Sequence, residues 1–229
     1  MWPGAPHDRS ARNSGTSEVR TSDDQSTGTA GTTGRRGRGR RPADQVRAEV
    51  LEATARLLFA DGLAAVTFER VAAESGASKT TLYKWWPSRG ALALDAYARS
   101  VQPALAFPDT GDIAADLTAQ LRSFVALTTG SPAGRVIAEL IGQAQTDPDL
   151  AEAYRTHYSR PRRDLAVAAV CRARDRGQLR ADTDPEAVVD QLWGACYHRL
   201  LIQDEPLTER FATTLVAQLL DGLRPARKT

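Results

Sequence analysis

The sequence lacks the features that membrane proteins, disulfide-rich secreted proteins and metalloproteins require. Its longest uninterrupted apolar run, Leu165 to Cys171, is far shorter than a membrane span. No charged start followed by an apolar stretch and a small-residue cleavage site is present, so we expect no secretory signal. The two cysteines, Cys171 and Cys196, have no Cys or His neighbours at zinc spacing. We therefore expect a cytoplasmic protein without a metal, a cofactor or a membrane partner.

Lysine is scarce as well, because only Lys79, Lys84 and Lys228 contribute to the 30 basic residues. This arginine bias, together with many alanines, is typical of GC-rich bacterial genes. The formal net charge of +2 is unevenly distributed, at −1 for residues 1–34, +5 for 35–90 and −2 for 91–229. Because phosphate neutralisation dominates nucleic-acid affinity, residues 35–90 are where a polyanion would bind.

The N-terminal segment has two parts of different composition. Residues 1–34 are almost half Gly, Ser and Thr, and too few apolar residues are present to offset the entropy of ordering, so we expect a disordered tail. Residues 35–43 form a basic arm, in which the candidate DNA contacts are Arg36, Arg38, Arg40 and Arg41. Such an arm can follow a phosphate backbone or enter a minor groove, and the alternative is a solvated charged linker.

From Pro42 onward the apolar residues recur at helical spacing. Val46, Val50, Ala53 and Leu57 predict a first helix from about 44 to 60. Later segments at about 112–128, 134–145, 148–176, 185–202 and 207–223 repeat the pattern, with Pro- and Gly-containing breakers between them. With no alternating strand pattern and no internal repeat, the sequence predicts an all-α fold of about nine helices.

Residues 62–89, GLAAVTFERVAAESGASKTTLYKWWPSR, contain two short helices joined by a turn. Thr67 can cap the first helix and Ser78 the second, while Gly76 can supply the positive φ of the turn. Pro87 ends the second helix of the motif. Ser88 can cap the next helix, the fourth along the chain, which runs towards Val101. A helix, a Gly-containing turn and a second helix make up a helix-turn-helix.

This motif resembles the DNA-binding signature of TetR-family transcriptional regulators. The family pattern has Gly, then Thr, a hydrophobic-Ala-Ala stretch, Gly, Ser-Lys, Thr-Leu-Tyr and an aromatic-Pro-Ser-Lys/Arg, and it matches residues 44–104. The resemblance implies a three-helix DNA-binding domain at 44–104, with the motif at about 67–86. It also implies a helical ligand-binding and dimerisation domain at 105–229.

The second helix of the motif carries the residues expected to contact DNA. Its N-terminal end has Ser78, Lys79, Thr80 and Thr81, whose small or polar side chains let a backbone approach base edges in the major groove. Lys79 can meet guanine or a phosphate, and the threonines can offer hydroxyls or a methyl group to thymine. Leu82 and Trp86 should point inward and anchor the helix on the residues Val50, Leu57, Phe68 and Val71.

Further candidates should hold the phosphates without reading sequence. Tyr83 and Lys84 suit phosphate clamping, and the resemblance implies that Tyr83 is the family's phosphate-binding tyrosine. Thr67 at a helix N-terminus and Arg89 in the first turn of the fourth helix are phosphate candidates too. The alternatives are a half-buried surface tyrosine and a plain surface charge. Trp85 replaces the smaller polar ring usual in the family, and its role stays open.

The last two helices are expected to join two copies of the chain. The resemblance implies a homodimer through about 185–202 and 207–223. The first of these carries two apolar stripes, one with Val188 and Leu192 and the other with Val189 and Cys196. One stripe covers a core and two indicate a partner, although both could be buried within one subunit. A two-fold dimer is also what a palindromic DNA site requires.

The effector site is harder to place, because the helices can pack in several ways. The aromatic and titratable candidates are Phe124, Tyr154, His157, Tyr158, Trp193, Tyr197 and, as a further histidine, His198. Each is more often a core or surface residue than a ligand contact. Neither the identity of the small-molecule effector nor the operator sequence follows from these residues.

The leading hypothesis is therefore a ligand-responsive transcriptional regulator. Repression rather than activation is what the resemblance to the family implies. As a homodimer it would bind a palindromic operator in double-stranded DNA and leave it when the effector binds. One alternative is an enzyme that uses His157, His198, Cys171 or Cys196, but no nucleophile–base set or phosphate loop is visible. The other is an interaction protein whose helix-turn-helix is vestigial.

Overall fold

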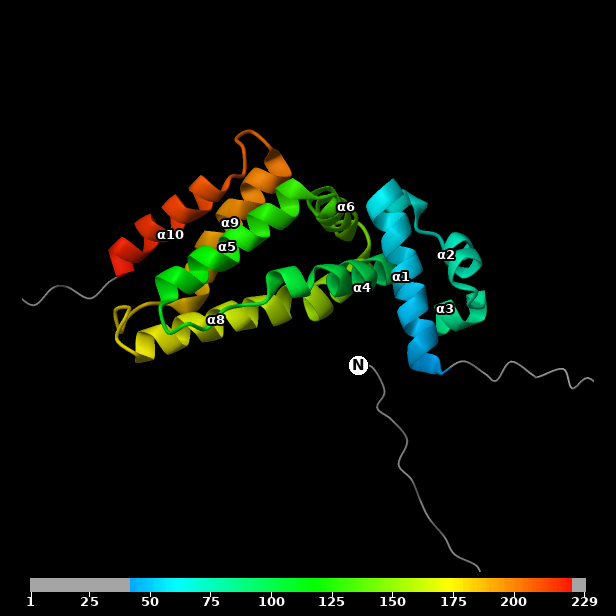
Figure 1. Ribbon diagram of the computed structural model, residues 1–229, viewed down its shortest axis with the longest axis horizontal. Coiled ribbons are helices and arrows are strands. Elements are labelled where there is room, and N and C mark those ends of the chain that lie inside the picture. The colour runs from blue at the N-terminus through cyan, green and yellow to red at the C-terminus, as the bar shows by residue number, and fades with distance from the viewer. Residues whose placement is uncertain (1–41, 224–229) are drawn as a thin grey trace, which may run out of the picture. The chain divides into compact units, whose positions relative to one another are not determined.

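The structure is a computed structural model that describes residues 42–223, and these residues form helices and no strands (Figure 1). The α-helices are α1 (Ala43–Asp61), α2 (Phe68–Ser75), α3 (Lys79–Trp85), α4 (Arg89–Val101), α5 (Ile113–Gly130), α6 (Ala133–Ala144), α7 (Pro148–Ala153), α8 (Arg160–Asp175), α9 (Pro185–Ile202) and α10 (Glu209–Leu223). Two short 3₁₀ turns, η1 (Leu63–Ala65) and η2 (Pro103–Leu105), and a π-helical turn, η3 (Tyr154–Ser159), complete the elements. The tail at 1–34 and the arm arginines Arg36, Arg38, Arg40 and Arg41 lie outside the described residues.

The all-α prediction is confirmed. Because α7, η3 and α8 follow one another without a break, they form one helical rod, and residues 42–223 then contain nine helices, as predicted. The predicted bounds agree with the observed ones to within about two residues, and the helix at Pro185–Ile202 agrees at both ends. In length or in apolar character, the helices of the described part fall short of what crossing a bilayer requires.

The first helix owes its packing to the stripe that predicted it. Val50, Ala53, Leu57 and Leu58 are all buried, and α1 packs against α4 on one side and against α2 on another (Figure 1). Their spacing of three and four residues places them on one face of the helix. The sequence pattern of α1 therefore holds the helix-turn-helix and the long α4 together.

A glycine permits the close crossing of α5 and α6. A Cβ atom built on Gly134 would lie 2.0 Å from the backbone oxygen of Thr128, well inside van der Waals contact. Any side chain at this position would force the two helices apart. The segment Gly130-Ser131-Pro132, predicted only as a breaker, therefore forms a tight connection that depends on Gly134 in the first turn of α6.

The rod from α7 to α8 contains a feature that the sequence analysis missed. Pro161 has no N–H to donate and its ring would clash with the carbonyl four residues earlier, which a regular helix cannot accommodate. The chain widens into the π turn η3 just before this proline, and the Arg160 N–H donates to the carbonyl of Arg155. The wider turn keeps the rod continuous while changing the direction of the side chains it carries.

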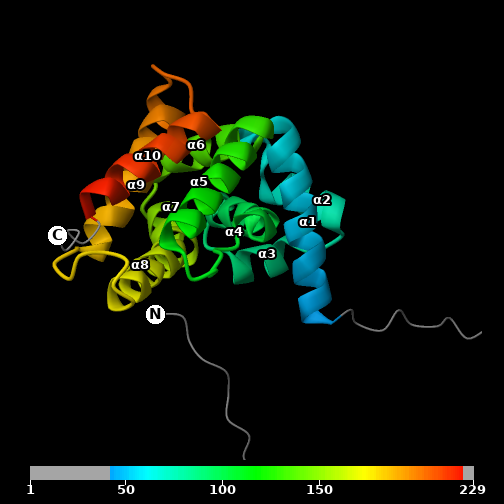
Figure 2. The ribbon, with the colours of Figure 1, turned by 60° about the vertical axis from the view of Figure 1, so that its left-hand side comes forward.

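The packing of α9 contradicts the inference that two apolar stripes indicate a partner. Apolar residues of both predicted stripes, Val188, Val189, Leu192, Cys196 and Leu200, are buried within the single chain. Two stripes therefore do not by themselves require a partner, and the alternative of burial within one subunit describes these residues. The last helix, α10, packs along α5, as both views of the ribbon show (Figures 1 and 2).

Candidate nucleic-acid interface and internal cavity

The helix α3 is anchored from its inner face, as predicted. Leu82 is fully buried and Trp86 is 3% exposed, and both belong to the hydrophobic core that includes Val50, Phe68 and Val71. Leu57 is part of the same core. These contacts leave the opposite face of α3 free to meet another molecule.

Polar contacts around Trp86 fix the end of α3 against two other helices. The Trp86 indole N–H donates to the Asp95 carboxylate of α4 at 3.0 Å. Arg47 of α1 donates to the same oxygen at 2.8 Å, and its guanidinium lies 5.3 Å from the centre of the Trp86 ring. A shift of α1 or α4 must therefore move α3 as well.

The two helices of the motif begin at the residues that the sequence assigned as caps. Thr67 accepts a hydrogen bond from the Arg70 N–H at 3.2 Å, and Ser78 accepts one from the Thr81 N–H at 3.1 Å. The Ser78 and Thr81 hydroxyls also lie 2.9 Å apart. Gly76 in the turn between them has φ +66°, the left-handed conformation that the sequence predicted.

At the start of α3, Lys79 is held by an acid of α2. Its ammonium group lies 2.7 Å from the Glu69 carboxylate, and both side chains are more than half exposed. The hydrogen bond to Lys79 lowers the pKa of Glu69, and the same bond raises the pKa of Lys79. Glu69 therefore occupies one of the three N–H donors of Lys79. Thr80 beside it is exposed.

Tyr83 stands on the exposed face of α3, with 58% of its surface accessible. Its ring packs on Phe68, with the ring centres 4.4 Å apart, which supports the ring while leaving much of the side chain open. Lys84 is exposed, and so is Arg89, the first residue of α4 after its capping Ser88. The half-buried Trp85 makes an edge-to-face contact with Trp86 at 5.6 Å.

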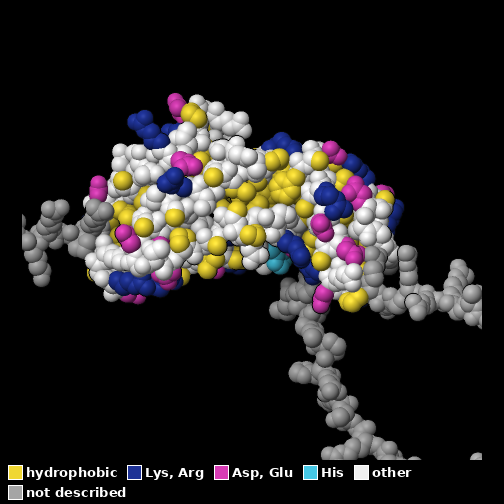
Figure 3. All heavy atoms as spheres, viewed as in Figure 1, with side chains coloured by type: hydrophobic (Ala, Val, Ile, Leu, Met, Phe, Trp, Pro, Cys, Tyr) yellow, Lys and Arg dark blue, Asp and Glu magenta, His cyan; other side chains and the backbone are white. Residues whose placement is uncertain are grey.

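Charge on this part of the chain is mixed. Figure 3 shows basic and acidic side chains side by side over the region of α1 to α3. The ion pairs Lys79–Glu69 and Arg70–Asp61 account for part of this mixture. Residues 42–90 hold six basic and six acidic residues, so the +5 assigned to residues 35–90 comes entirely from the five arginines at 35–41.

The larger helical part contains a partly open cavity of about 400 Å³ between α5, η3, α8 and α9. Five of the predicted effector contacts line it: Phe124, Tyr154, Tyr158, Trp193 and Tyr197. His157 is exposed and does not lie in the cavity wall, because it occupies the outer side of η3. The residues that the sequence analysis missed include Leu105, Phe107, Gln120, Arg162, Arg163 and Asp190.

Three tyrosines that line this cavity, Tyr154, Tyr158 and Tyr197, form a cluster with Tyr97 of α4. The ring of Tyr158 lies 5.5 Å from that of Tyr154 and 5.6 Å from that of Tyr97 on α4. Burial raises the pKa of Tyr154 to about 12 and raises the pKa values of Tyr158, Tyr97 and Tyr197 as well. All four phenols therefore stay neutral at physiological pH, and the cluster connects the cavity with α4.

Two polar side chains donate hydrogen bonds to one backbone carbonyl at the end of η2. The Leu105 oxygen accepts from the Gln120 amide at 3.2 Å and from the Arg162 guanidinium at 3.4 Å. The Arg162 guanidinium also lies 5.3 Å from the centre of the Tyr158 ring. Both donors come from helices that line the cavity, so the chain leaving α4 is held by groups that a bound molecule would touch.

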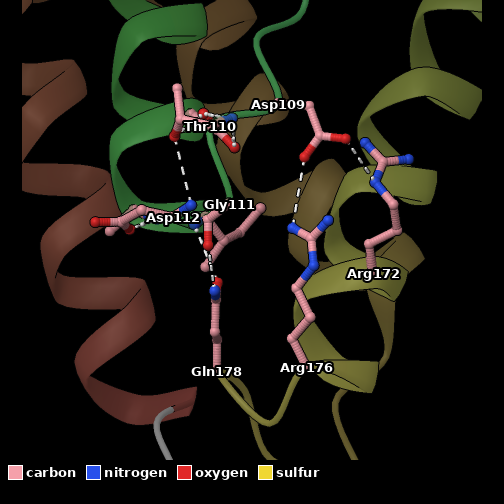
Figure 4. A network of polar contacts seen from close by, with 10 residues as sticks. Asp109, Thr110, Gly111, Asp112, Arg172, Arg176 and Gln178 are labelled. Carbon is pink, nitrogen blue, oxygen red and sulfur yellow. Dashed lines mark hydrogen bonds and ion pairs between the residues drawn. The ribbon is translucent and has the colours of Figure 1, made fainter.

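Ion pairs and hydrogen bonds also hold the segment between η2 and α5 in place (Figure 4). The Asp109 carboxylate pairs with Arg172 of α8 at 3.2 Å and with Arg176, the residue that follows α8, at 3.5 Å. The Gln178 side chain accepts from the Ile113 N–H at 3.1 Å and donates to the Gly111 carbonyl. Together with the hydrogen bonds to the Leu105 carbonyl, these contacts hold the chain on both sides of Phe107, which lines the cavity.

A second set of contacts joins α6 to the helix-turn-helix. Glu139 accepts a hydrogen bond from the Leu63 backbone N–H at 2.7 Å, and its other carboxylate oxygen pairs with Arg135 at 2.8 Å. Arg135 also donates to the Phe59 carbonyl near the end of α1, at 3.2 Å. We call Arg135 and Glu139 the α6 clamp.

The groups considered for catalysis differ in burial, and Cys171 is half-buried. Burial raises the pKa of the Cys196 thiol to about 12, which disfavours the thiolate that a nucleophile needs. His157 and His198 are exposed. Among residues 42–223, no group of three or more His, Cys, Asp or Glu side chains is placed to hold a metal ion.

Two family models match the chain. The model described as bacterial regulatory proteins, tetR family, matches residues 50–96. The model described as tetracyclin repressor-like, C-terminal domain, matches residues 107–219. The first covers the helix-turn-helix, and the second covers the helices around the cavity.

Known proteins similar to the chain are regulators. It is 33% identical over 190 residues to the uncharacterized HTH-type transcriptional regulator YdeS of Bacillus subtilis, covering 82% of this chain and 96% of that protein. It is 30% identical over 176 residues to the DNA-binding transcriptional repressor TetR of Mycobacteroides abscessus, with 76% and 90% coverage. The crystal structure of the TetR family transcription regulator SCO0332 superposes with a TM-score of 0.73 at 61% identity, covering 79% of this chain and all of that one.

Proposed function

The chain belongs to the TetR family of bacterial transcriptional regulators, and from this premise we propose that it is a ligand-responsive repressor. As a homodimer it binds a palindromic operator through α3, and it releases the operator when a small molecule occupies the cavity. Residues 44–104 serve DNA binding, and residues 105–229 serve effector binding and dimerisation. The protein acts in the cytoplasm, on DNA, and members of this family are regulators rather than enzymes.

The observation that carries this proposal is the outward face of α3. Lys79, Thr80, Tyr83 and Lys84 are exposed on a helix whose inner face is fully anchored through Leu82. A rigid helix with short polar side chains at its N-terminal end can enter a major groove and reach base edges. Tyr83, Lys84, Thr67 and Arg89 then contact phosphates on either side. Trp85 supports the Trp86 anchor from the side of the helix end.

The dimer forms through α9 and α10. Apolar side chains stay partly uncovered there, with Ile202 62% and Leu201 39% exposed and Leu215 and Leu219 half-buried. TetR-family regulators typically act as dimers, and a two-fold contact would cover these side chains. It would also set the two α3 helices about 34–36 Å apart, the separation of successive major grooves on one face of DNA.

Two structural connections can carry a signal from the cavity to the DNA-binding part. The first runs from Tyr158 to Tyr97 on α4 and on to Phe59 on α1, whose ring lies 6.1 Å from that of Tyr97. The second is the α6 clamp on the end of α1. A ligand that binds one arrangement of these helices more tightly than the other shifts the population towards the arrangement with the wrong α3 spacing.

The test is the selection of genomic DNA fragments by the purified protein at near-physiological salt. We expect the wild type to enrich a palindrome and the double variant Lys79→Ala/Tyr83→Ala to lose this enrichment. Lys228→Ala, which removes the one lysine outside the motif, is the charge control and should enrich the same palindrome. If wild type and double variant bind DNA equally and without sequence preference, the basic arm is responsible and the role of α3 is wrong.

A further inference from the structure

The cavity gathers a large share of the few aromatic residues in the chain. The sequence contains four Trp, five Tyr and five Phe residues, and six of these fourteen line the cavity. The cavity volume of about 400 Å³ is more than twice the ~150 Å³ that accepts benzene in an apolar protein cavity. Aromatic walls favour planar aromatic guests through edge-to-face and offset-stacked contacts. A molecule with one or two fused rings fits both the size and the walls.

The cavity also carries an excess positive charge. Three charged side chains line it, and Arg163 is paired with Asp190 through two contacts, of 3.1 and 3.0 Å. Arg162 remains, and within residues 42–223 no carboxylate forms an ion pair with it. Its contacts are the carbonyl of Leu105 and the ring of Tyr158. A partly buried guanidinium held only by a carbonyl and a ring is a receptor for an anion, and the planar fork of Arg suits a carboxylate.

A buried acceptor lies beside this cation. Gln120 is 3% exposed, and its amide nitrogen donates to the same Leu105 carbonyl as Arg162, which fixes the orientation of the amide. The remaining oxygen, Gln120 Oε1, is buried without a hydrogen-bond partner among the described residues. Leaving a buried acceptor unpaired is costly, and a donor supplied by a ligand removes that cost.

We propose that the effector is an aromatic carboxylate with an N–H or O–H donor next to its carboxylate group. The carboxylate binds Arg162, the donor binds Gln120 Oε1, and the ring lies among the aromatic side chains of the cavity wall. Because Arg162 and Gln120 share one carbonyl, the acid and the donor must be neighbours on the ligand. This assignment rests on the proposed function and names the chemical class of its effector.

The same assignment explains how a bound ligand would affect the C-terminal end of α4. When a carboxylate draws Arg162 away, the Leu105 carbonyl loses one of its two donors. Leu105 ends η2, which directly follows α4, the helix that packs against α1. Occupation of the cavity therefore loosens the segment that holds the C-terminal end of α4.

The test is isothermal titration calorimetry on the full chain with three matched probes. They are 3-amino-2-naphthoate, its neutral carboxamide, and 2-naphthoate, which lacks the amine. We expect the carboxamide to bind about 10- to 100-fold more weakly than the amino acid probe, the usual effect of one charge-assisted hydrogen bond. We expect 2-naphthoate to bind several-fold more weakly, because Gln120 Oε1 then stays unpaired.

Variants locate the effect on the named residue. Arg162→Gln should reduce acid binding to the level of the carboxamide while leaving carboxamide binding unchanged, and that unchanged binding shows that the cavity is intact. Arg162→Lys should keep part of the preference for the acid. The matched control is Arg160→Gln, two residues earlier on the same helix, exposed and outside the cavity wall, and it should behave as wild type.

Equal binding of acid and carboxamide would overturn the proposal, and so would an unchanged preference in Arg162→Gln. Absence of binding by all three probes would overturn it too. None of these outcomes touches the repressor assignment, because that assignment is tested by fragment selection without any ligand. Conversely, if the chain binds the acid through Arg162 but enriches no palindrome, the proposed ligand class stands and the proposed operator binding is wrong.

Discussion

At the scale of single residues, the unexpected contact is the ion pair between Lys79 and Glu69. The sequence analysis assigned Lys79 to DNA, and the structure shows its ammonium group 2.7 Å from a carboxylate of the neighbouring helix. An exposed pair of this kind is weak, since water and salt screen it. Even so, if Lys79 binds DNA as proposed, the carboxylate of Glu69 would compete with a phosphate or a guanine edge for it.

We predict that Glu69→Gln strengthens operator binding by about two- to fivefold, the range expected for release of one exposed ion pair. Fluorescence anisotropy with a labelled operator at several salt concentrations measures this, and the gain should shrink as salt rises. The control is Glu74→Gln, which removes the same charge from the same helix, from an exposed position. An equal gain in both variants would mean that only the overall charge of α2 matters.

At the scale of elements, the helices were predictable because periodicity and breakers are local properties. Thr67, Ser78 and Gly76 occupy the conformations that their chemistry favours, and Leu82 and Trp86 point inward. The π turn was missed, although Pro161 inside a predicted helix was a usable signal.

The cavity could be predicted only in part. Tyr154, Tyr158 and Trp193 stood out as aromatic residues on the relevant helices. Arg162 and Gln120 did not, because their roles depend on two helices meeting at the carbonyl of Leu105. Such convergence is a property of packing, and a single sequence does not contain it. The same holds for the α6 clamp, whose glutamate lies 76 residues from the amide it caps.

For the α6 clamp we predict that Glu139→Ala lowers the free energy of unfolding by about 1–2 kcal/mol, because the Leu63 N–H loses its acceptor. Glu139→Gln should cost less, since its carboxamide oxygen still accepts that bond. Hydrogen exchange at the Leu63 amide, read beside urea denaturation, separates the two variants. A suitable control is Glu152→Ala, whose contacts stay within its own helical rod. Unchanged exchange at Leu63 in Glu139→Ala would contradict the role of the clamp.

At the scale of the whole molecule, buried acidic groups set an alkaline limit to stability. The ordinary pKa values of 9.0 for Cys196 and 10.0 for Tyr154 both rise to about 12 in the folded chain, chiefly through burial. Above about pH 9 the unfolded chain releases protons that the folded chain retains. The free energy of unfolding therefore falls as pH rises, by up to about 1.4 kcal/mol per pH unit for each such group.

We thus predict a urea midpoint that is nearly constant from pH 7 to about 8.5 and falls steeply between about pH 9 and 12. In a Tyr83→Phe background, which removes the exposed tyrosine and leaves the four of the cluster, absorbance of tyrosinate at 295 nm should appear with unfolding rather than before it. Tyr154→Phe removes one of the groups and should make the fall shallower. A midpoint that stayed level across this window would show that the tyrosines and Cys196 ionise as easily in the folded chain as in the unfolded one.

The distribution of charge over the whole chain leads to a prediction about its affinity for DNA. Residues 42–90 carry no net charge, so the helix-turn-helix brings shape and base contacts, and the five arginines at 35–41 bring all the excess positive charge.

Each phosphate that a protein neutralises on duplex DNA contributes about −0.9 to the slope of log K against log salt. Removing residues 1–41 should therefore flatten this slope by up to about 4.5 and weaken binding to operator and to random DNA alike. The ratio of the two affinities should stay nearly constant if, as proposed, α3 reads the bases. Removing residues 1–34 alone leaves every arm arginine in place and should change neither the slope nor the affinity by much. If loss of 1–41 instead abolished the preference for the operator, the arm would be reading sequence, and the assignment of specificity to Lys79, Thr80 and Thr81 would have to be shared with it.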